Sequence, residues 1–208
     1  MIIEQVIALV THFIINLIQS TGYIGIFLLM AAESALIPIP SEVTMPFAGY
    51  LVTLGKFNFL TVVFVGALAN LVGSLLAYGL GFWGSETFVR NFITKYGKWF
   101  LVSSKEFDHS NKWFRRYGEK IVFLGRILPV VRTYISLPAG VAEMDFWRFS
   151  LFTLAGSFIW SYLLTYIGVT LGKNWNSLQI YYRKLELLII GLIVIGAVYY
   201  ICNKLKRK

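Results

Sequence analysis

Long apolar runs separated by short charged stretches dominate the pattern along the chain. Residues 60–82 and 149–171 each run for 23 residues without a formal charge, which exceeds the roughly 20 residues that a helix needs to cross a bilayer. A third apolar run becomes long enough when its flanking residues are included. The pattern therefore predicts transmembrane helices over 57–83, 146–172 and 185–202.

Two further apolar segments, residues 22–55 and 121–142, are interrupted by prolines and charged side chains. Each proline lacks a backbone N–H and disfavours helix in the residue before it, so neither segment is expected to be a simple spanning helix. Irregular backbone survives at membrane depth only where protein or a wet cavity covers it. We therefore expect two re-entrant hairpins that face each other. The residues expected to shape them are Pro38, Pro40, Pro46, Gly49, Gly125, Pro129, Pro138 and Gly140.

Four charged side chains stand within these segments: Glu33 and Glu42 in the first, Arg126 and Arg132 in the second. A charge at the bilayer centre costs roughly 2.5–3.5 kcal/mol on insertion scales, so such residues persist where they serve one another or a ligand. The planar fork of arginine suits carboxylate and phosphate alike. The four residues therefore predict a phosphate-binding site, with a purely structural lock of salt bridges as the alternative.

A faint internal repeat accompanies these features. A shift of the sequence by 89 residues aligns Pro40 with Pro129 and Gly79 with Gly168, and in both halves a broken segment precedes a long helix that contains glycines. Inverted repeats of this kind are typical of secondary transporters, which hold substrate at the repeat interface. The predicted fold is an all-α polytopic membrane protein with two inverted repeats, each a re-entrant hairpin followed by a long transmembrane helix, plus a C-terminal transmembrane helix.

Composition and charge place this fold in a membrane. The 208 residues are 57% hydrophobic and 14% charged, which is too apolar for a soluble domain. The net charge of +9 gathers in residues 84–120 and in the C-terminal tail, as the positive-inside rule predicts for cytoplasmic segments, so we expect no nucleic-acid partner. Residues 84–120 are expected to form amphipathic helices on the inner leaflet. Residues 1–21 are expected to be a retained apolar helix within one membrane domain.

The sequence offers little that points to catalysis. The single cysteine excludes an intramolecular disulfide and a multi-cysteine metal site. The two histidines, His12 and His109, lie outside the broken segments, and no HExxH or GxSxG motif occurs. We therefore expect no enzyme, metal or cofactor, with a lipid phosphatase as the enzymatic alternative.

Two motifs carry a resemblance to a known family. The run ESALIPIPSE at residues 33–42 and the run GRILPVVR at residues 125–132 resemble the signature segments of the DedA family, also described as the VTT domain. The resemblance covers about residues 15–200. It implies a multi-pass protein of the bacterial inner membrane that moves phospholipid-like substrates between leaflets, with family members linked to undecaprenyl phosphate, to phosphatidylethanolamine and to the proton-motive force. By motif position, it also implies essential roles for Glu33, Glu42, Arg126 and Arg132.

These observations predict a transporter that moves a phosphate-headgroup lipid between leaflets, with undecaprenyl phosphate as the favoured substrate. We expect Arg126 and Arg132 to bind the phosphate, and Glu33 and Glu42 to pair with them in the empty site. Protonation of a carboxylate would then free an arginine and couple transport to a proton gradient. The alternatives are a phosphatidylethanolamine flippase, a proton-coupled transporter of small ions or drugs, and a structural scaffold; a homo-oligomer is left open.

Overall fold

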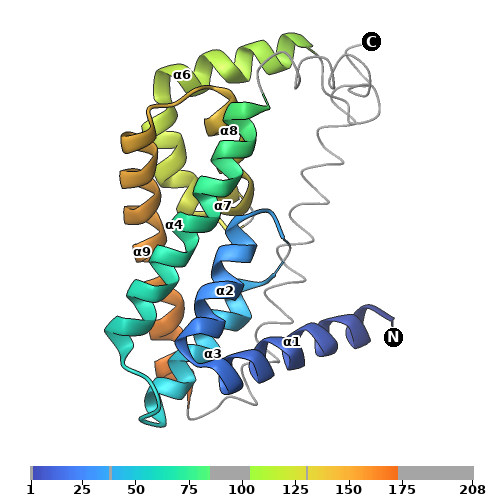
Figure 1. The fold of residues 1–208 in the computed structure, drawn as a ribbon, viewed down its shortest axis with the longest axis vertical. Helices are drawn as coiled ribbons and strands as arrows, with labels where there is room; N and C mark the ends of the chain where they lie inside the picture. The colour runs from blue at the N-terminus through green and yellow to red at the C-terminus, as the bar shows by residue number, and fades with distance from the viewer. Residues whose placement is uncertain (1, 38, 85–103, 130, 173–208) are drawn as a thin grey trace. The chain divides into compact units, whose positions relative to one another are not determined.

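The computed structural model describes residues 2–37, 39–84, 104–129 and 131–172, and every regular element within them is a helix. The chain divides into two compact units, Met1–Val169 and Thr170–Lys208, and the predicted span over 185–202 lies outside the described residues. The helices, labelled in Figure 1, are α1 (Ile2–Thr21), α2 (Tyr23–Ser34), α3 (Ser41–Thr53), α4 (Phe59–Trp83), α6 (Ser104–Ile127), α7 (Val131–Tyr134), α8 (Ser136–Val141) and α9 (Phe146–Leu171).

Helices α4 and α9 are the long apolar elements of the fold. Each has the length and hydropathy to cross a membrane, and their bounds nearly coincide with the spans predicted over 57–83 and 146–172. On α4, the exposed side chains include Leu60, Leu68, Leu76 and Leu80, and the buried residues include Gly66, Ala69, Gly73, Ala77 and Gly81. A small-residue inner face with large apolar residues outside is the pattern of a helix that packs in lipid.

The two long helices run antiparallel. Phe64 of α4 contacts Phe158 of α9 with 5.3 Å between ring centroids, while Tyr78, further along α4, stacks on Phe149 near the start of α9 at 4.7 Å. Tyr78 also donates a hydrogen bond of 2.5 Å from its hydroxyl to the carbonyl of Met144. These contacts fix the turn before α9 against the end of α4.

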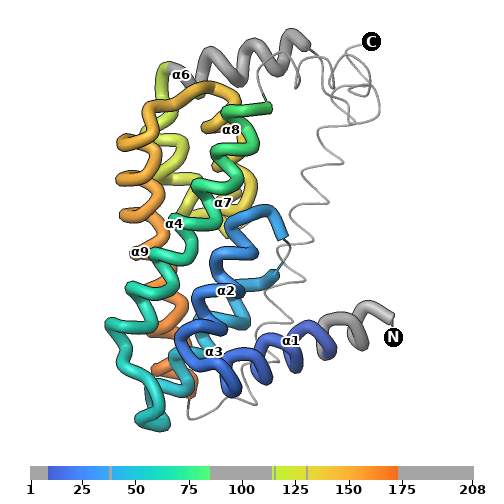
Figure 2. Tube along the Cα trace, in the orientation of Figure 1, coloured from blue at the N-terminus to red at the C-terminus, as the bar shows by residue number. Residues whose placement is uncertain are grey.

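The first proline-interrupted segment folds as two helices, α2 and α3, joined by residues 35–40. Figure 2 shows α3 returning alongside α2 after this turn. The end of α2 is a Schellman arrangement, in which the Ile37 N–H donates to the Ala32 carbonyl at 3.1 Å and Leu36 has a φ of 74°. The left-handed conformation of Leu36 costs roughly 1–2 kcal/mol. It reverses the chain tightly, so that the last turn of α2 meets the first turn of α3.

Two of the predicted helix-breaking prolines lie inside helices. Helix α3 continues through Pro46, so the prediction that this proline interrupts the helix is wrong. Pro138 is the third residue of α8, where a backbone N–H would lack a helical partner in any case. Pro40 directly precedes α3, and Pro129 lies between α6 and α7, so these two stand at the actual breaks. Pro38 lies outside the described residues.

The second proline-interrupted segment begins inside a longer helix. Helix α6 extends to Ile127 across the boundary that we predicted between residues 120 and 121, and it has a kink at Tyr117, where φ is −128° and ψ is 15°. The short helices α7 and α8 follow. Of the stretch predicted to lie on the inner leaflet, residues 85–103 are outside the described part of the chain.

Glycines let each proline-containing segment cross the long helix of the other half closely. A Cβ atom on Gly49 of α3 would overlap the carbonyl oxygen of Thr165 and lie 3.0 Å from the Cα of Gly168 in α9. A Cβ atom on Gly140 of α8 would overlap the carbonyl oxygen of Tyr78 and lie 2.8 Å from the Phe82 nitrogen in α4. Such reciprocal crossing is what an inverted repeat would produce. The repeat itself and the re-entry of the hairpins into a membrane stay predictions.

We expect Gly81→Ala to destabilise the fold and Gly79→Ala to leave it nearly unchanged. A Cβ atom at Gly81 would overlap the carbonyl oxygen of Leu137, whereas one at Gly79 would meet only Trp83 at 3.8 Å. Overpacking of this kind typically costs about 1–3 kcal/mol. Thermal unfolding of both variants in detergent checks the expectation, and equal melting temperatures would contradict the close crossing.

Candidate functional site

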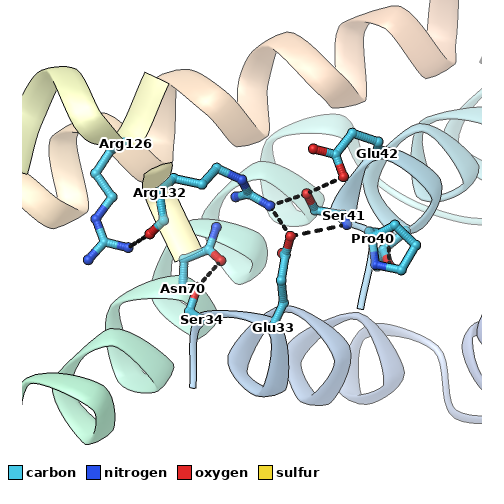
Figure 3. Close-up of polar contacts among 9 residues, drawn as sticks. Glu33, Ser34, Pro40, Ser41, Glu42, Asn70, Arg126 and Arg132 are labelled. Carbon is cyan, nitrogen blue, oxygen red and sulfur yellow. Dashed lines mark hydrogen bonds and ion pairs between the residues drawn. The ribbon is translucent and has the colours of Figure 1, made fainter. Parts of the chain in front are cut away.

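A buried ion pair joins the two proline-interrupted segments close to their helix breaks. The Arg132 Nη2 on α7 donates to Glu33 Oε1 at the end of α2 and to Ser41 Oγ at the start of α3. Arg132 is 4% exposed and Glu33 is 5% exposed. The Ser41 backbone N–H also donates to Glu33 Oε1 at 3.3 Å. Figure 3 shows this convergence. It brings together one acidic and one basic residue of the predicted site that are 99 positions apart in the sequence.

Glu42 joins this group through a hydroxyl. The Ser41 Oγ donates to Glu42 Oε2 at 3.4 Å, and Glu42 is partly buried. Glu42 therefore lies one hydrogen bond away from Arg132. The structure places Glu42 beside the site without the direct ion pair that the sequence led us to expect.

Arg126 has a different environment, because its hydrogen-bond partners are all neutral. Its Nη1 donates to the Arg132 carbonyl at 2.9 Å, and its Nη2 donates to Ser136 Oγ at 2.6 Å and to Thr153 Oγ1 at 3.4 Å. The guanidinium carbon lies 5.9 Å from the centre of the Phe149 ring. Arg126 is 2% exposed, and no carboxylate of the described residues forms an ion pair with it.

This second arginine is costly to bury. Buried charges are normally paired with an opposite charge or a metal, because desolvation is otherwise uncompensated. Here Arg126 fixes the backbone of Arg132 while keeping its own positive charge. A Cβ atom at Gly156 of α9 would lie 2.6 Å from the Cβ of Arg126, so the glycine provides the space for the arginine stem. The arrangement leaves a positive charge in the interior that an anion would neutralise.

Sequence reasoning did not select several polar residues of the site. Ser41 lies in the ESALIPIPSE run but is uncharged, so it was not chosen with the acidic residues of that run, and Ser136 and Thr153 stand in otherwise apolar stretches. Trp160 of α9 lies beneath Arg132, with 5.0 Å from the guanidinium carbon to the ring centre, a geometry typical of cation–π contacts. All of these residues are buried. A helical wheel of each helix would have placed them on the inward-facing side.

Polar atoms without a partner are mostly hydrogen-bond donors in this region. The buried side-chain atoms of the described residues that lack a hydrogen bond are Glu33 Oε2, Asn70 Nδ2, Ser74 Oγ, Arg126 Nε, Arg132 Nε, Trp160 Nε1 and Ser161 Oγ. Four of these carry an N–H that can only donate. Unpaired buried donors each cost about 1–3 kcal/mol. A surplus of donors together with two guanidinium groups suits a ligand rich in acceptor oxygens, such as a phosphate group.

Comparison with known proteins identifies the family of this chain. The VTT domain model matches residues 39–170. The chain is 33% identical over 192 residues to undecaprenyl phosphate transporter A of Bacillus subtilis (strain 168), covering 92% of this chain and 93% of that protein. It is 32% identical over 196 residues to undecaprenyl phosphate transporter A of Staphylococcus aureus (strain NCTC 8325 / PS 47), covering 94% and 97%.

A further relative has a different kind of name. The alkaline phosphatase-like protein of Lactococcus lactis subsp. lactis (strain IL1403) is 29% identical over 189 residues, covering 89% of this chain and 88% of that protein. No solved structure matches the chain. The extent of the domain match and the coverage of the relatives confirm the resemblance that the two sequence motifs carry: this chain is a membrane protein of the DedA family, whose shared unit is the VTT domain.

Proposed function

We propose that this protein moves a phosphate-headgroup lipid, with undecaprenyl phosphate as the favoured substrate, between the leaflets of the bacterial cell membrane. The observation that carries the proposal is the buried Arg132–Glu33 pair beside Arg126, a cation without a carboxylate partner among the described residues. The relatives named undecaprenyl phosphate transporter A support the choice of substrate. The positive-inside pattern supports a multi-pass arrangement in the inner membrane with the C-terminus in the cytoplasm.

Substrate binding would begin with an exchange of anions on Arg132. The phosphate replaces the Glu33 carboxylate on the guanidinium fork, which binds either group in the same planar geometry. Arg126 holds the Arg132 carbonyl in place and supplies the second positive charge, while the apolar tail of the lipid remains in the bilayer. No covalent chemistry on the substrate is required.

The same exchange provides a route for coupling to protons. Glu33 of α2 pairs with Arg132 of α7 and lies close to Ser41 and Glu42 of α3. When Glu33 takes up a proton, it loses its attraction for Arg132 and releases the guanidinium to the phosphate. A proton gradient across the membrane would then favour loading on the acidic side.

The alternatives differ in the ligand that this site would prefer. Phosphatidylethanolamine carries an ammonium group in addition to its phosphate, and Glu42 is the partly buried carboxylate that would bind it. Two buried arginines disfavour a small cation or a cationic drug. A phosphatase is favoured by the names of two relatives, which are both alkaline phosphatase-like proteins of Lactococcus lactis. Release of inorganic phosphate by the purified protein would replace the transport proposal with an enzymatic one.

We expect Arg132→Ala and Arg126→Ala to abolish movement of labelled undecaprenyl phosphate between leaflets of proteoliposomes, because each removes a headgroup ligand or its support. Arg132→Lys keeps the charge but loses the planar fork, so it should transport at least tenfold more slowly than wild type. Arg148→Ala is the matched control, since Arg148 is exposed and pairs with the exposed Glu119 at 2.5 Å. Labelled phosphatidylethanolamine in parallel vesicles identifies the preferred lipid.

Folding must be verified before a loss of transport is interpreted. Removing one member of a buried ion pair typically costs about 3–5 kcal/mol, so the melting temperature and the elution profile of each variant are measured in detergent. Folded arginine variants that still move undecaprenyl phosphate at the wild-type rate would contradict the proposed site. Absence of lipid movement in the wild-type protein would contradict the proposed function itself.

Glu33→Gln should remove the dependence of lipid movement on an imposed pH gradient. Glutamine retains an acceptor for the Ser41 N–H but carries no charge at any pH, so it resembles the protonated acid. Wild-type movement should accelerate when the loading side is acidified, whereas the variant should move lipid at one rate under both gradients. Glu119→Gln, an exposed substitution, is the control. A variant that keeps the wild-type gradient dependence would rule out Glu33 as the coupling group.

A further inference from the structure

Asn70 is a buried polar residue of α4 that the proposed exchange at Arg132 does not use. It is 1% exposed, and its Oδ1 accepts a hydrogen bond of 2.6 Å from the Ser34 hydroxyl at the end of α2. Close packing makes this bond feasible, because a Cβ atom at Gly73 would lie only 2.9 Å from the Cβ of Ser34. A hydrogen bond between helices therefore explains one half of the carboxamide.

The other half of the carboxamide has no partner. Asn70 Nδ2 is buried and unbonded, as are the Nε atoms of Arg126 and Arg132. In Figure 3 the amide nitrogen of Asn70 is turned toward the side chain of Arg132, and Ser34 is the neighbour of Glu33 in α2. One N–H-bearing atom on each of three buried side chains, from α4, α6 and α7, thus lacks a hydrogen-bond partner. A protein that keeps such donors unpaired does so at a cost, unless a ligand accepts from them.

We propose that the Asn70 carboxamide is a further substrate-binding group, which donates from Nδ2 to an oxygen of the lipid phosphate. This inference rests on the proposed function. A neutral donor suits this position because it strengthens phosphate binding without requiring a carboxylate partner in the empty site, as a third buried cation would. Ser34 positions the amide by donating to Oδ1, which directs Nδ2 toward the ligand.

The test compares Asn70→Leu with Ser34→Ala in detergent-purified full-length protein. Each variant removes the Ser34–Asn70 hydrogen bond, but only Asn70→Leu removes the donor. Farnesyl phosphate and farnesol serve as probes that differ in the phosphate alone, and their affinities are measured by the shift that each causes in melting temperature. We expect Asn70→Leu to weaken the binding of farnesyl phosphate at least tenfold, as for a lost hydrogen bond to a charged group. The affinity for farnesol should be unaffected. Ser34→Ala should cause a smaller loss of affinity for farnesyl phosphate.

Matched controls separate binding from folding. Asn58→Asp changes the asparagine that caps the start of α4, where its Oδ1 accepts from the Thr61 N–H at 3.2 Å. Aspartate caps a helix equally well, so this variant should bind as wild type does. If Asn70→Leu does not fold, Asn70→Thr, which keeps a hydroxyl for Ser34 but loses the amide donor, is tested in the same way. It should show the same phosphate-specific loss.

The outcomes distinguish this inference from the proposed function. Equal effects of Asn70→Leu and Ser34→Ala on both probes would overturn the inference and leave Asn70 as an interhelical contact. The same holds if wild type prefers the phosphate, Arg132→Ala abolishes that preference and Asn70→Leu retains it. If wild-type protein binds farnesyl phosphate no more tightly than farnesol, the proposed function fails and the role of Asn70 fails with it.

Discussion

The buried pair between Arg132 and Glu33 is the contact on which the rest of the site depends. It joins α7 to α2 and, through Ser41, to α3, so one guanidinium links the helix breaks of both proline-interrupted segments. Such a pair contributes little net stability, because desolvation offsets most of the attraction, yet breaking it by removing one partner is expensive. A pair with these energetics is suited to exchange, in which one anion leaves only as another arrives.

The neighbouring Arg126 determines which anion the exchange at Arg132 favours. Arg126 holds the Arg132 backbone through the Arg132 carbonyl, and its neutral hydrogen-bond partners do not neutralise its charge. The two arginines therefore have one directly paired carboxylate between them. An incoming anion therefore gains attraction that Glu33 alone does not satisfy. This imbalance favours phosphate over a second protein carboxylate and disfavours a cation, which is the physical reason for preferring a lipid phosphate over the small-cation alternative.

Local rules account for much of this structure and fail where tertiary contacts decide. Apolar run length indicated the helices α4 and α9, and the prolines together with four charged residues indicated both breaks and the site. The pairing of Arg132 with Glu33, while Arg126 binds neutral groups, depends on how distant helices pack and has no local signal. The continuation of α3 through Pro46 likewise depends on tertiary packing, because Gly168 of α9 leaves room for the backbone of Pro46.

Glycine contacts restrict how such a site could open. Each proline-containing segment crosses the long helix of the other half at a glycine. Gly49 of α3 lies against α9 and Gly140 of α8 lies against α4, with no space for a side chain between the backbones. Close-packed interfaces deform in discrete steps and not continuously. We therefore expect α3 to move with α9, and α8 to move with α4. Helix α2 also belongs with α4, because a Cβ atom at Gly73 would overlap the carbonyl oxygen of Ala31. Glu33 at the end of α2 and Ser41 at the start of α3 then lie on different bodies, so the hydrogen bond between the Ser41 N–H and Glu33 is a contact that must separate when the site opens.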